Sequence, residues 1–111
     1  MTLTPFLAEK REALFALFRR YPVERVYAFG SSVSSAFDAE RSDVDLIVHL
    51  GDLPPLERGR QLLALWEDLE RLLERPVDLL TDRPIKNPYL RRSIEASKLL
   101  IYDRKGQEVP V

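Results

Sequence analysis

The run SDVDLIVHL at residues 42–50 is the most strand-like part of the chain, and it carries two aspartates. It is dense in Val, Leu and Ile, and the run GDLPP at residues 51–55 breaks it, so we predict a strand over residues 43–50. Side chains alternate along a strand, which places Asp43 and Asp45 on one face and leaves the opposite face apolar. An otherwise hydrophobic strand is therefore expected to carry two carboxylates side by side.

The paired aspartates indicate a cation site. Two carboxylates two positions apart on a strand lie roughly 6–7 Å from each other, and at an effective dielectric constant of ~20 they repel by about 2–3 kcal/mol. A Mg²⁺ ion between Asp43 and Asp45 would reverse the sign of that interaction, and Mg²⁺ favours one or two carboxylates together with phosphate oxygens. A D-x-D pattern alone is weak evidence. The alternative is that Asp43 begins the strand and only Asp45 is partly buried.

A third carboxylate lies in the apolar run VDLL, residues 77–80. If this run is a strand beside residues 43–50, Asp78 completes a cluster of three carboxylates with Asp43 and Asp45. Such a cluster can hold two ions, and paired ions clamp the attacking and leaving oxygens in phosphoryl transfer.

Gly30-Ser31 follows the β-branched and aromatic run at residues 23–29, which we predict to be a strand. Glycine permits a tight turn with close backbone approach to a phosphate, and successive N–H groups can form an anion-binding nest. The Ser31 hydroxyl supplies one more donor. The alternative is an ordinary strand-ending turn. No Walker lysine follows, so this is not a P-loop.

The remaining elements follow from hydrophobic spacing and from turn residues. We predict a helix over residues 5–20 with Thr4 as its cap, a helical turn near 32–36, a helix over 56–75, a strand over 77–81, a helix from Asn87-Pro88 to residue 97, and a strand over 99–102. Helices that alternate with strands are typical of a layered α/β domain. We expect one domain over residues 1–111, with a tail at about 103–111.

Composition limits the function classes. The chain has 111 residues, 17 Lys and Arg against 18 Asp and Glu, and a net charge of −1, which argues against a broad basic surface for nucleic acid. The absence of cysteine excludes a disulfide scaffold and a thiolate zinc site. The N-terminal segment is too charged for a secretory signal, and the apolar runs are far short of the ~20 residues that span a bilayer. We therefore expect a cytoplasmic protein that binds neither membranes nor nucleic acid directly.

Three separated motifs together resemble a known family. They are Phe29-Gly30-Ser31, then SDVDLIV at residues 42–48, then VDLL at residues 77–80. This order resembles the minimal nucleotidyltransferases (MNT) of the DNA polymerase beta superfamily, whose signature is G-S, a spacer, D-x-D and a third acidic strand. The resemblance covers nearly the whole chain. It implies a nucleotidyltransferase fold with a mixed β-sheet of about four strands, backed by helices on one side.

The resemblance also implies roles for single residues. Gly30 and Ser31 would hold the terminal phosphates of the nucleotide. Asp43 and Asp45 would bind Mg²⁺ and the triphosphate, and Asp78 would bind a second Mg²⁺ ion and help to deprotonate the acceptor hydroxyl. The implied reaction transfers AMP from ATP, with release of pyrophosphate. Catalysis of this kind is mostly positioning and charge neutralisation, and it needs no protein nucleophile.

Small members of this family resemble antitoxins that pair with a helical ribonuclease toxin of the HEPN class. The resemblance implies a hetero-oligomer in which the antitoxin AMPylates a tyrosine of its partner. This chain departs from the family pattern after Gly-Ser: residues 32–35 read SVSS where Arg or Gly is usual, and the spacer from Ser31 to Asp43 has 11 residues.

Three functions therefore stay open: an active adenylyltransferase for a protein partner, a catalytically weakened antitoxin that neutralises its partner by contact, and a small-molecule adenylyltransferase. The third ranks last, because such enzymes carry a second, acceptor-binding domain and this chain has no residues left for one.

The other conspicuous side chains are interpreted as structural. His49 lies about 13 Å along the strand from Asp45, too far to share its ion. Trp66 lies on an apolar helix face, as do Phe15, Phe18 and Tyr21 of the first helix, and we expect all four to pack in the core.

Overall fold

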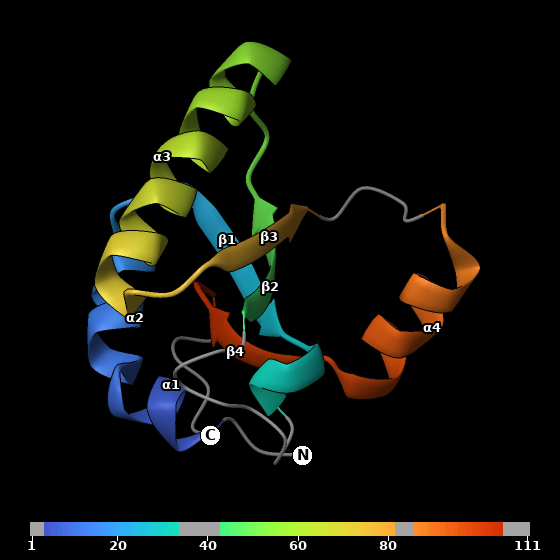
Figure 1. Cartoon of the computed structure of the whole chain (residues 1–111). Helices are drawn as coiled ribbons and strands as arrows, with labels where there is room; N and C mark the ends of the chain where they lie inside the picture. The colour runs from blue at the N-terminus through green and yellow to red at the C-terminus, as the bar shows by residue number, and fades with distance from the viewer. Residues whose placement is uncertain (1–3, 34–42, 82–85, 106–111) are drawn as a thin grey trace.

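The structure, a computed structural model, describes residues 4–33, 43–81 and 86–105. Four strands form one sheet in the order β3-β2-β1-β4, as Figure 1 shows. The elements are α1 (Pro5–Glu9), α2 (Arg11–Arg19), β1 (Val23–Ala28), the 3-10 helix η1 (Gly30–Val33), β2 (Val44–Leu50), α3 (Pro55–Leu73), β3 (Val77–Thr81), α4 (Pro88–Ser97) and β4 (Leu99–Asp103).

The sheet is mixed. β1 pairs antiparallel with both β2 and β4, whereas β2 and β3 run parallel. A parallel pair needs a crossover connection, and α3 supplies it. The crossover ends at Glu74, whose φ of 53° turns the chain in the left-handed region. Two α3 side chains then hold the start of β3: Trp66 Nε1 donates to the Val77 carbonyl at 2.9 Å, and Glu70 Oε2 accepts from the Val77 amide at 2.8 Å.

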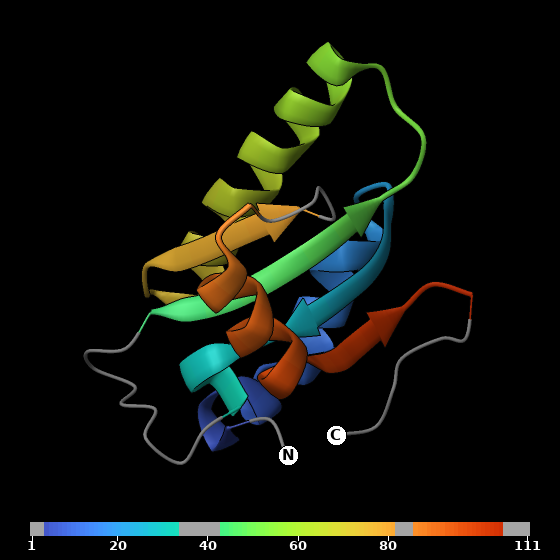
Figure 2. The same ribbon diagram turned by 90° about the vertical axis from the view of Figure 1, so that its right-hand side faces the viewer.

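The helices form a thick layer on one face of the sheet and a thin one on the other, as Figure 2 shows. α1, α2 and α3 bury the main core against the sheet, with Phe18, Leu65 and Leu69 fully buried. On the opposite face α4 makes a small cluster, in which Ile94 packs with Phe29 and Ile47. The predicted α/β class and mixed sheet are confirmed. The expectation of helices on one side holds for α1–α3 and is wrong for α4.

Most predicted elements are present, with informative differences at the ends. The single helix expected over residues 5–20 is two helices, because the chain breaks at Lys10 (φ −97°, ψ 10°). Thr4 does not cap α1 through its side chain, and its buried hydroxyl has no hydrogen-bond partner among the described residues. Asn87 does cap α4: its side chain accepts from the amides of Tyr89 and Leu90.

Two other expectations concern the turn after β1 and the aromatic side chains. The helical turn expected near residues 32–36 is η1, and the part from residue 34 on lies outside the described residues. Phe15 and Phe18 pack on Tyr102 as expected of core residues, with ring centroids 6.0 and 5.3 Å from it. Trp66 is not a core residue: it is 38% exposed, and its indole N–H donates to the backbone carbonyl of Val77 at the start of β3. No helix within the described ranges is long and apolar enough to cross a membrane.

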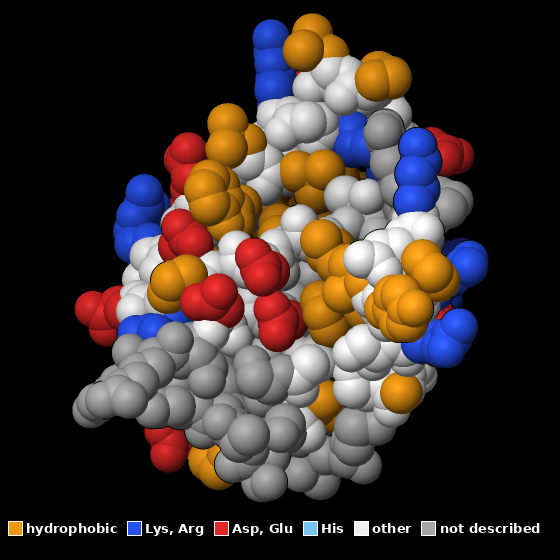
Figure 3. All heavy atoms as spheres, turned by 45° about the vertical axis from the view of Figure 1, so that its right-hand side comes forward, with side chains coloured by type: hydrophobic (Ala, Val, Ile, Leu, Met, Phe, Trp, Pro, Cys, Tyr) orange, Lys and Arg blue, Asp and Glu red, His pale blue; other side chains and the backbone are white. Residues whose placement is uncertain are grey.

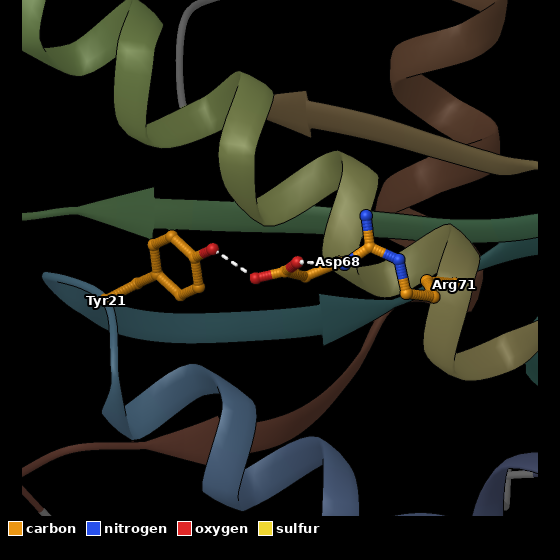
Figure 4. A network of polar contacts seen from close by, with 3 residues as sticks. All are labelled: Tyr21, Asp68 and Arg71. Atoms are coloured by element: carbon orange, nitrogen blue, oxygen red, sulfur yellow. Dashed lines mark hydrogen bonds and ion pairs between the residues drawn. The ribbon is translucent and has the colours of Figure 1, made fainter.

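A polar network ties the end of α2 to α3 (Figure 4). The Tyr21 hydroxyl donates to one carboxylate oxygen of Asp68, and Arg71 contacts the other at 3.1 Å. Burial, together with the hydrogen bond to Asp68 and its negative charge, raises the pKa of Tyr21 from 10.0 to about 12. The phenol therefore contributes to stability in its protonated form.

This pKa predicts how stability changes in alkali. The contribution of Tyr21 is complete below the unfolded pKa of 10.0 and is lost as the pH rises through the folded pKa of about 12. The free energy of unfolding, measured by urea titration and far-UV circular dichroism, should fall more steeply between pH 10 and 12 in the wild type than in Tyr21→Phe. Parallel curves for the two proteins would contradict the assignment.

Candidate active site

Asp45 and Asp78 are partners across the parallel pair of β2 and β3. Val44 and Leu46, which flank Asp45, are buried in the core under α1–α3, so the Asp45 side chain lies on the α4 face. Val77 belongs to the same core, which turns Asp78 to the α4 face as well. Neighbouring strands lie about 4.8 Å apart. The prediction that the strand of Asp78 lies beside the strand of Asp45 is confirmed.

Asp43 directly precedes β2 and is exposed, as is Asp78, whereas Asp45 is half-buried. Figure 3 shows acidic side chains gathered near the middle of this face, with hydrophobic side chains on both flanks. α4, which covers this face, exposes Tyr89 and Leu90, whereas the exposed Leu56, Leu63 and Trp66 belong to α3 in the opposite helical layer. The face thus combines carboxylates, which suit cations, with apolar surface that water solvates poorly.

The turn after β1 lies against Asp45. Gly30 has a φ of +61°, which L side chains rarely adopt, and a Cβ added there would come within 2.7 Å of Asp45 Oδ2. The amide of Phe29 donates to the Asp45 carbonyl at 3.1 Å, which ties the start of the turn to β2. Only glycine lets the backbone approach this carboxylate so closely.

Two serines that the sequence analysis did not single out hold this turn. The Gly30 amide donates to Ser97 Oγ at 3.0 Å, and Ser97 Oγ in turn donates to the Ser93 carbonyl at 2.9 Å. On the other side Ser32 Oγ accepts from the Asp45 amide at 2.9 Å. No sequence signal marks the role of either residue, because serine is a common residue and both hydrogen bonds join segments far apart in the chain. The backbone of Ser31 lies in η1, and the role expected of its side chain stays a prediction.

His49 lies on β2 beyond the carboxylates and packs on Tyr27, with 5.4 Å between the ring centroids. Lys98 Nζ lies 5.0 Å from the centroid of the same Tyr27 ring. These contacts agree with a structural role for the histidine.

The oxygen donors of this face are the carboxylates of Asp43, Asp45 and Asp78, and oxygen is the ligand that Mg²⁺ prefers. Within residues 4–33, 43–81 and 86–105, no group of three His, Cys, Asp or Glu side chains is arranged to hold a metal ion. The register nevertheless brings Asp45 opposite Asp78, with Asp43 two positions before Asp45. Mg²⁺ in proteins is usually held by one or two carboxylates together with substrate phosphates rather than by an all-protein cage. These carboxylates therefore fit an ion whose coordination phosphate oxygens complete.

Comparison with known proteins agrees with this geometry. The family model described as "Nucleotidyltransferase domain" matches residues 10–101. The chain is 37% identical over 83 residues to a Methanocaldococcus jannaschii protein named "Putative protein adenylyltransferase MJ1379", which covers 75% of this chain and 79% of that protein.

Two solved structures are also similar. One, described as "putative minimal nucleotidyltransferase", shares 33% identity at a TM-score of 0.58, and the match covers 84% of this chain and 90% of that chain. The other is a Shewanella oneidensis structure of a tri-AMPylated HEPN toxin in complex with MNT antitoxin. It shares 19% identity at a TM-score of 0.59, with coverage of 88% and 73%, and it shows likeness of fold alone.

The close approach of Gly30 to Asp45 predicts opposite effects for two glycine substitutions. Gly30→Ala should lower the free energy of unfolding by about 1–2 kcal/mol, because the new Cβ meets Asp45 and the residue keeps a left-handed conformation. Gly59→Ala in α3 is the matched control, since a Cβ there meets nothing within 4 Å. It should raise stability by about 0.5–1 kcal/mol. Chemical denaturation measures both, and a shift in the same direction for both variants would contradict the close approach.

Proposed function

Because the chain belongs to the nucleotidyltransferase domain family, we propose that this nucleotidyltransferase moves AMP from ATP to a protein hydroxyl, with a tyrosine of a HEPN-class partner as the acceptor. The observation that carries the proposal is the register of β2 and β3, which aligns Asp45 with Asp78 on the open face beside the Gly30 turn. Carboxylates next to a glycine turn suit a substrate that brings phosphates and a divalent cation.

The residues divide the work of the reaction. The Gly30–Ser31 turn would orient the terminal phosphates, and Asp43, Asp45 and Asp78 would hold Mg²⁺. When bound, Mg²⁺ supplies neutralisation of the negative charge on the phosphate oxygens. The acceptor oxygen forms a bond to the α-phosphorus while the bond from that phosphorus to the oxygen bridging the β-phosphorus breaks, so pyrophosphate leaves. Asp78, exposed at the edge of the site, takes the proton of the acceptor hydroxyl.

A protein acceptor is supported by two kinds of observation. The M. jannaschii relative is named as a protein adenylyltransferase, and the S. oneidensis structure with this fold joins an MNT antitoxin to an AMPylated HEPN toxin. This chain also exposes Tyr89 and Leu90 on α4, the helix that covers the face of the carboxylates. A partner that covers these side chains in a hetero-oligomer would bring its own hydroxyl to the carboxylates.

One observation favours the second candidate, an antitoxin that acts by contact. The Gly30 amide, which phosphate binding would use, already donates to Ser97 Oγ at 3.0 Å. ATP must displace that serine or use the remaining amides of η1. If the displacement is unfavourable, the chain binds its partner and neutralises it without transferring AMP.

Removing the aspartate pair separates these two candidates. Asp43→Asn/Asp45→Asn should lower AMP transfer by at least about 100-fold, because the substituted pair no longer supplies anionic oxygens to a cation. The assay contains Mg²⁺ and follows the transfer of label from α-labelled ATP to the product of the neighbouring gene. Asp52→Asn, an exposed aspartate after β2, is the charge control and should transfer at the wild-type rate.

Each result assigns one function. Label with the wild type and with Asp52→Asn, but not with the double variant, establishes adenylyl transfer. Absence of label with every protein, while the wild type and the double variant both bind and neutralise the partner, contradicts transfer and supports neutralisation by contact.

A further inference from the structure

Ser32 has a polar side chain in the buried, mostly apolar interior of the protein. It is completely buried, and its hydroxyl oxygen accepts the backbone N–H of Asp45 at 2.9 Å. Its own backbone is tied on both sides: its N–H donates to the Phe29 carbonyl at 3.2 Å, and its carbonyl accepts from the Thr4 amide at 3.2 Å. A buried serine held at three points is rigid, so the position of its hydroxyl is determined by the fold.

The need for this hydroxyl arises where β1 leaves the sheet. In an antiparallel pair, every second pair of opposed residues exchanges two hydrogen bonds, and Phe29 opposite Asp45 is at such a position. Phe29 makes the first of these with Asp45, since its amide donates to the Asp45 carbonyl at 3.1 Å. The Phe29 carbonyl, however, accepts from Ser32 as the chain turns into η1. The Ser32 hydroxyl therefore takes the place of that carbonyl as the acceptor for the Asp45 amide.

The hydrogen bond from the Asp45 amide to Ser32 Oγ holds the backbone of the residue that lies between Gly30 and Asp78 in the site. Gly30 lies against the Asp45 carboxylate, where an added Cβ would come within 2.7 Å of Oδ2, and Asp78 faces Asp45 from β3. Ser32 holds the Asp45 backbone between these two neighbours. If the hydroxyl is lost, the part-buried N–H of Asp45 loses this acceptor, and the start of β2 must shift to find another.

We propose that Ser32 is a positioning residue for nucleotidyl transfer: its buried hydroxyl holds the backbone of Asp45 so that the carboxylate stays beside the Gly30 turn and opposite Asp78. The inference rests on the proposed role of Asp45 as a Mg²⁺ ligand. Ser32 does not touch the ion itself and acts on it through Asp45. Partners of metal ligands in other proteins affect metal affinity or activity by ~10–100-fold.

Three variants test the proposal. Ser32→Ala removes the acceptor, Ser32→Cys keeps nearly the same volume with a weak acceptor, and Ser93→Ala removes an exposed serine side chain from α4 as the control. Three quantities are measured on folded protein: hydrogen exchange of the Asp45 amide by NMR, the Mg²⁺ concentration that half-shifts the Asp45 and Asp78 amide resonances, and kcat and KM for ATP in AMP transfer.

The expected result is faster exchange at Asp45, a Mg²⁺ midpoint about tenfold higher and a kcat lower by ~10–100-fold in Ser32→Ala and Ser32→Cys, with KM for ATP nearly unchanged. Ser93→Ala should match the wild type in all three. If Ser32→Ala does not fold, Ser32→Cys decides alone. Wild-type Mg²⁺ midpoint and kcat in the folded variants, even at a lower melting temperature, would overturn the proposal and leave Ser32 a packing residue.

The two proposals can fail separately. If the wild type transfers no AMP, the proposed function fails, and the exchange and Mg²⁺ titrations alone judge Ser32. If the wild type is active and Asp43→Asn/Asp45→Asn is inactive, but the Ser32 variants equal the wild type, only the positioning role fails.

Discussion

The parallel pairing of β2 with β3 determines both the path of the chain through α3 and the alignment of Asp45 with Asp78. Parallel neighbours require a crossover, and α3 provides it while packing its apolar stripe against the sheet. Trp66 and Glu70 of α3 hold Val77, the first residue of β3, which sets where the strand begins. A slip of one residue in this register would turn Asp78 toward the helical core. The alignment of the two carboxylates is therefore a consequence of how the crossover ends.

The position of the Asp45 carboxylate also depends on the turn where β1 leaves the sheet. Gly30 takes a left-handed conformation and brings the chain against the Asp45 carboxylate, and Ser32 supplies the acceptor that the departing strand no longer offers. Ser97 anchors the same turn to α4 through the Gly30 amide. Residues from the first third and the last fifth of the chain thus meet at one turn.

The unequal helical layers explain how the fold tolerates its carboxylates. Most of the buried apolar residues belong to the core under α1–α3, and no aspartate is buried in the part of the chain that the structure describes. Asp45 and Asp78 lie on the thinly covered face, where water solvates the exposed Asp78 and reduces the desolvation that a buried charge would suffer. The same openness leaves Tyr89 and Leu90 of α4 exposed, where the partner of the proposed complex would cover them.

Local chemistry in the sequence determined the strand that holds Asp45, the cap at Asn87, and the alternation that put the carboxylates on one face. These features depend on neighbours within a few residues, so they can be predicted without the fold. Only the packing of the elements determines that Asp78 lies opposite Asp45, that Trp66 donates to the Val77 carbonyl, and that Ser32 accepts from the Asp45 amide. Each of these contacts joins separate elements across the sheet or the crossover. Register and long-range hydrogen bonds have no periodicity in the sequence, because their partners are brought together only when the elements pack.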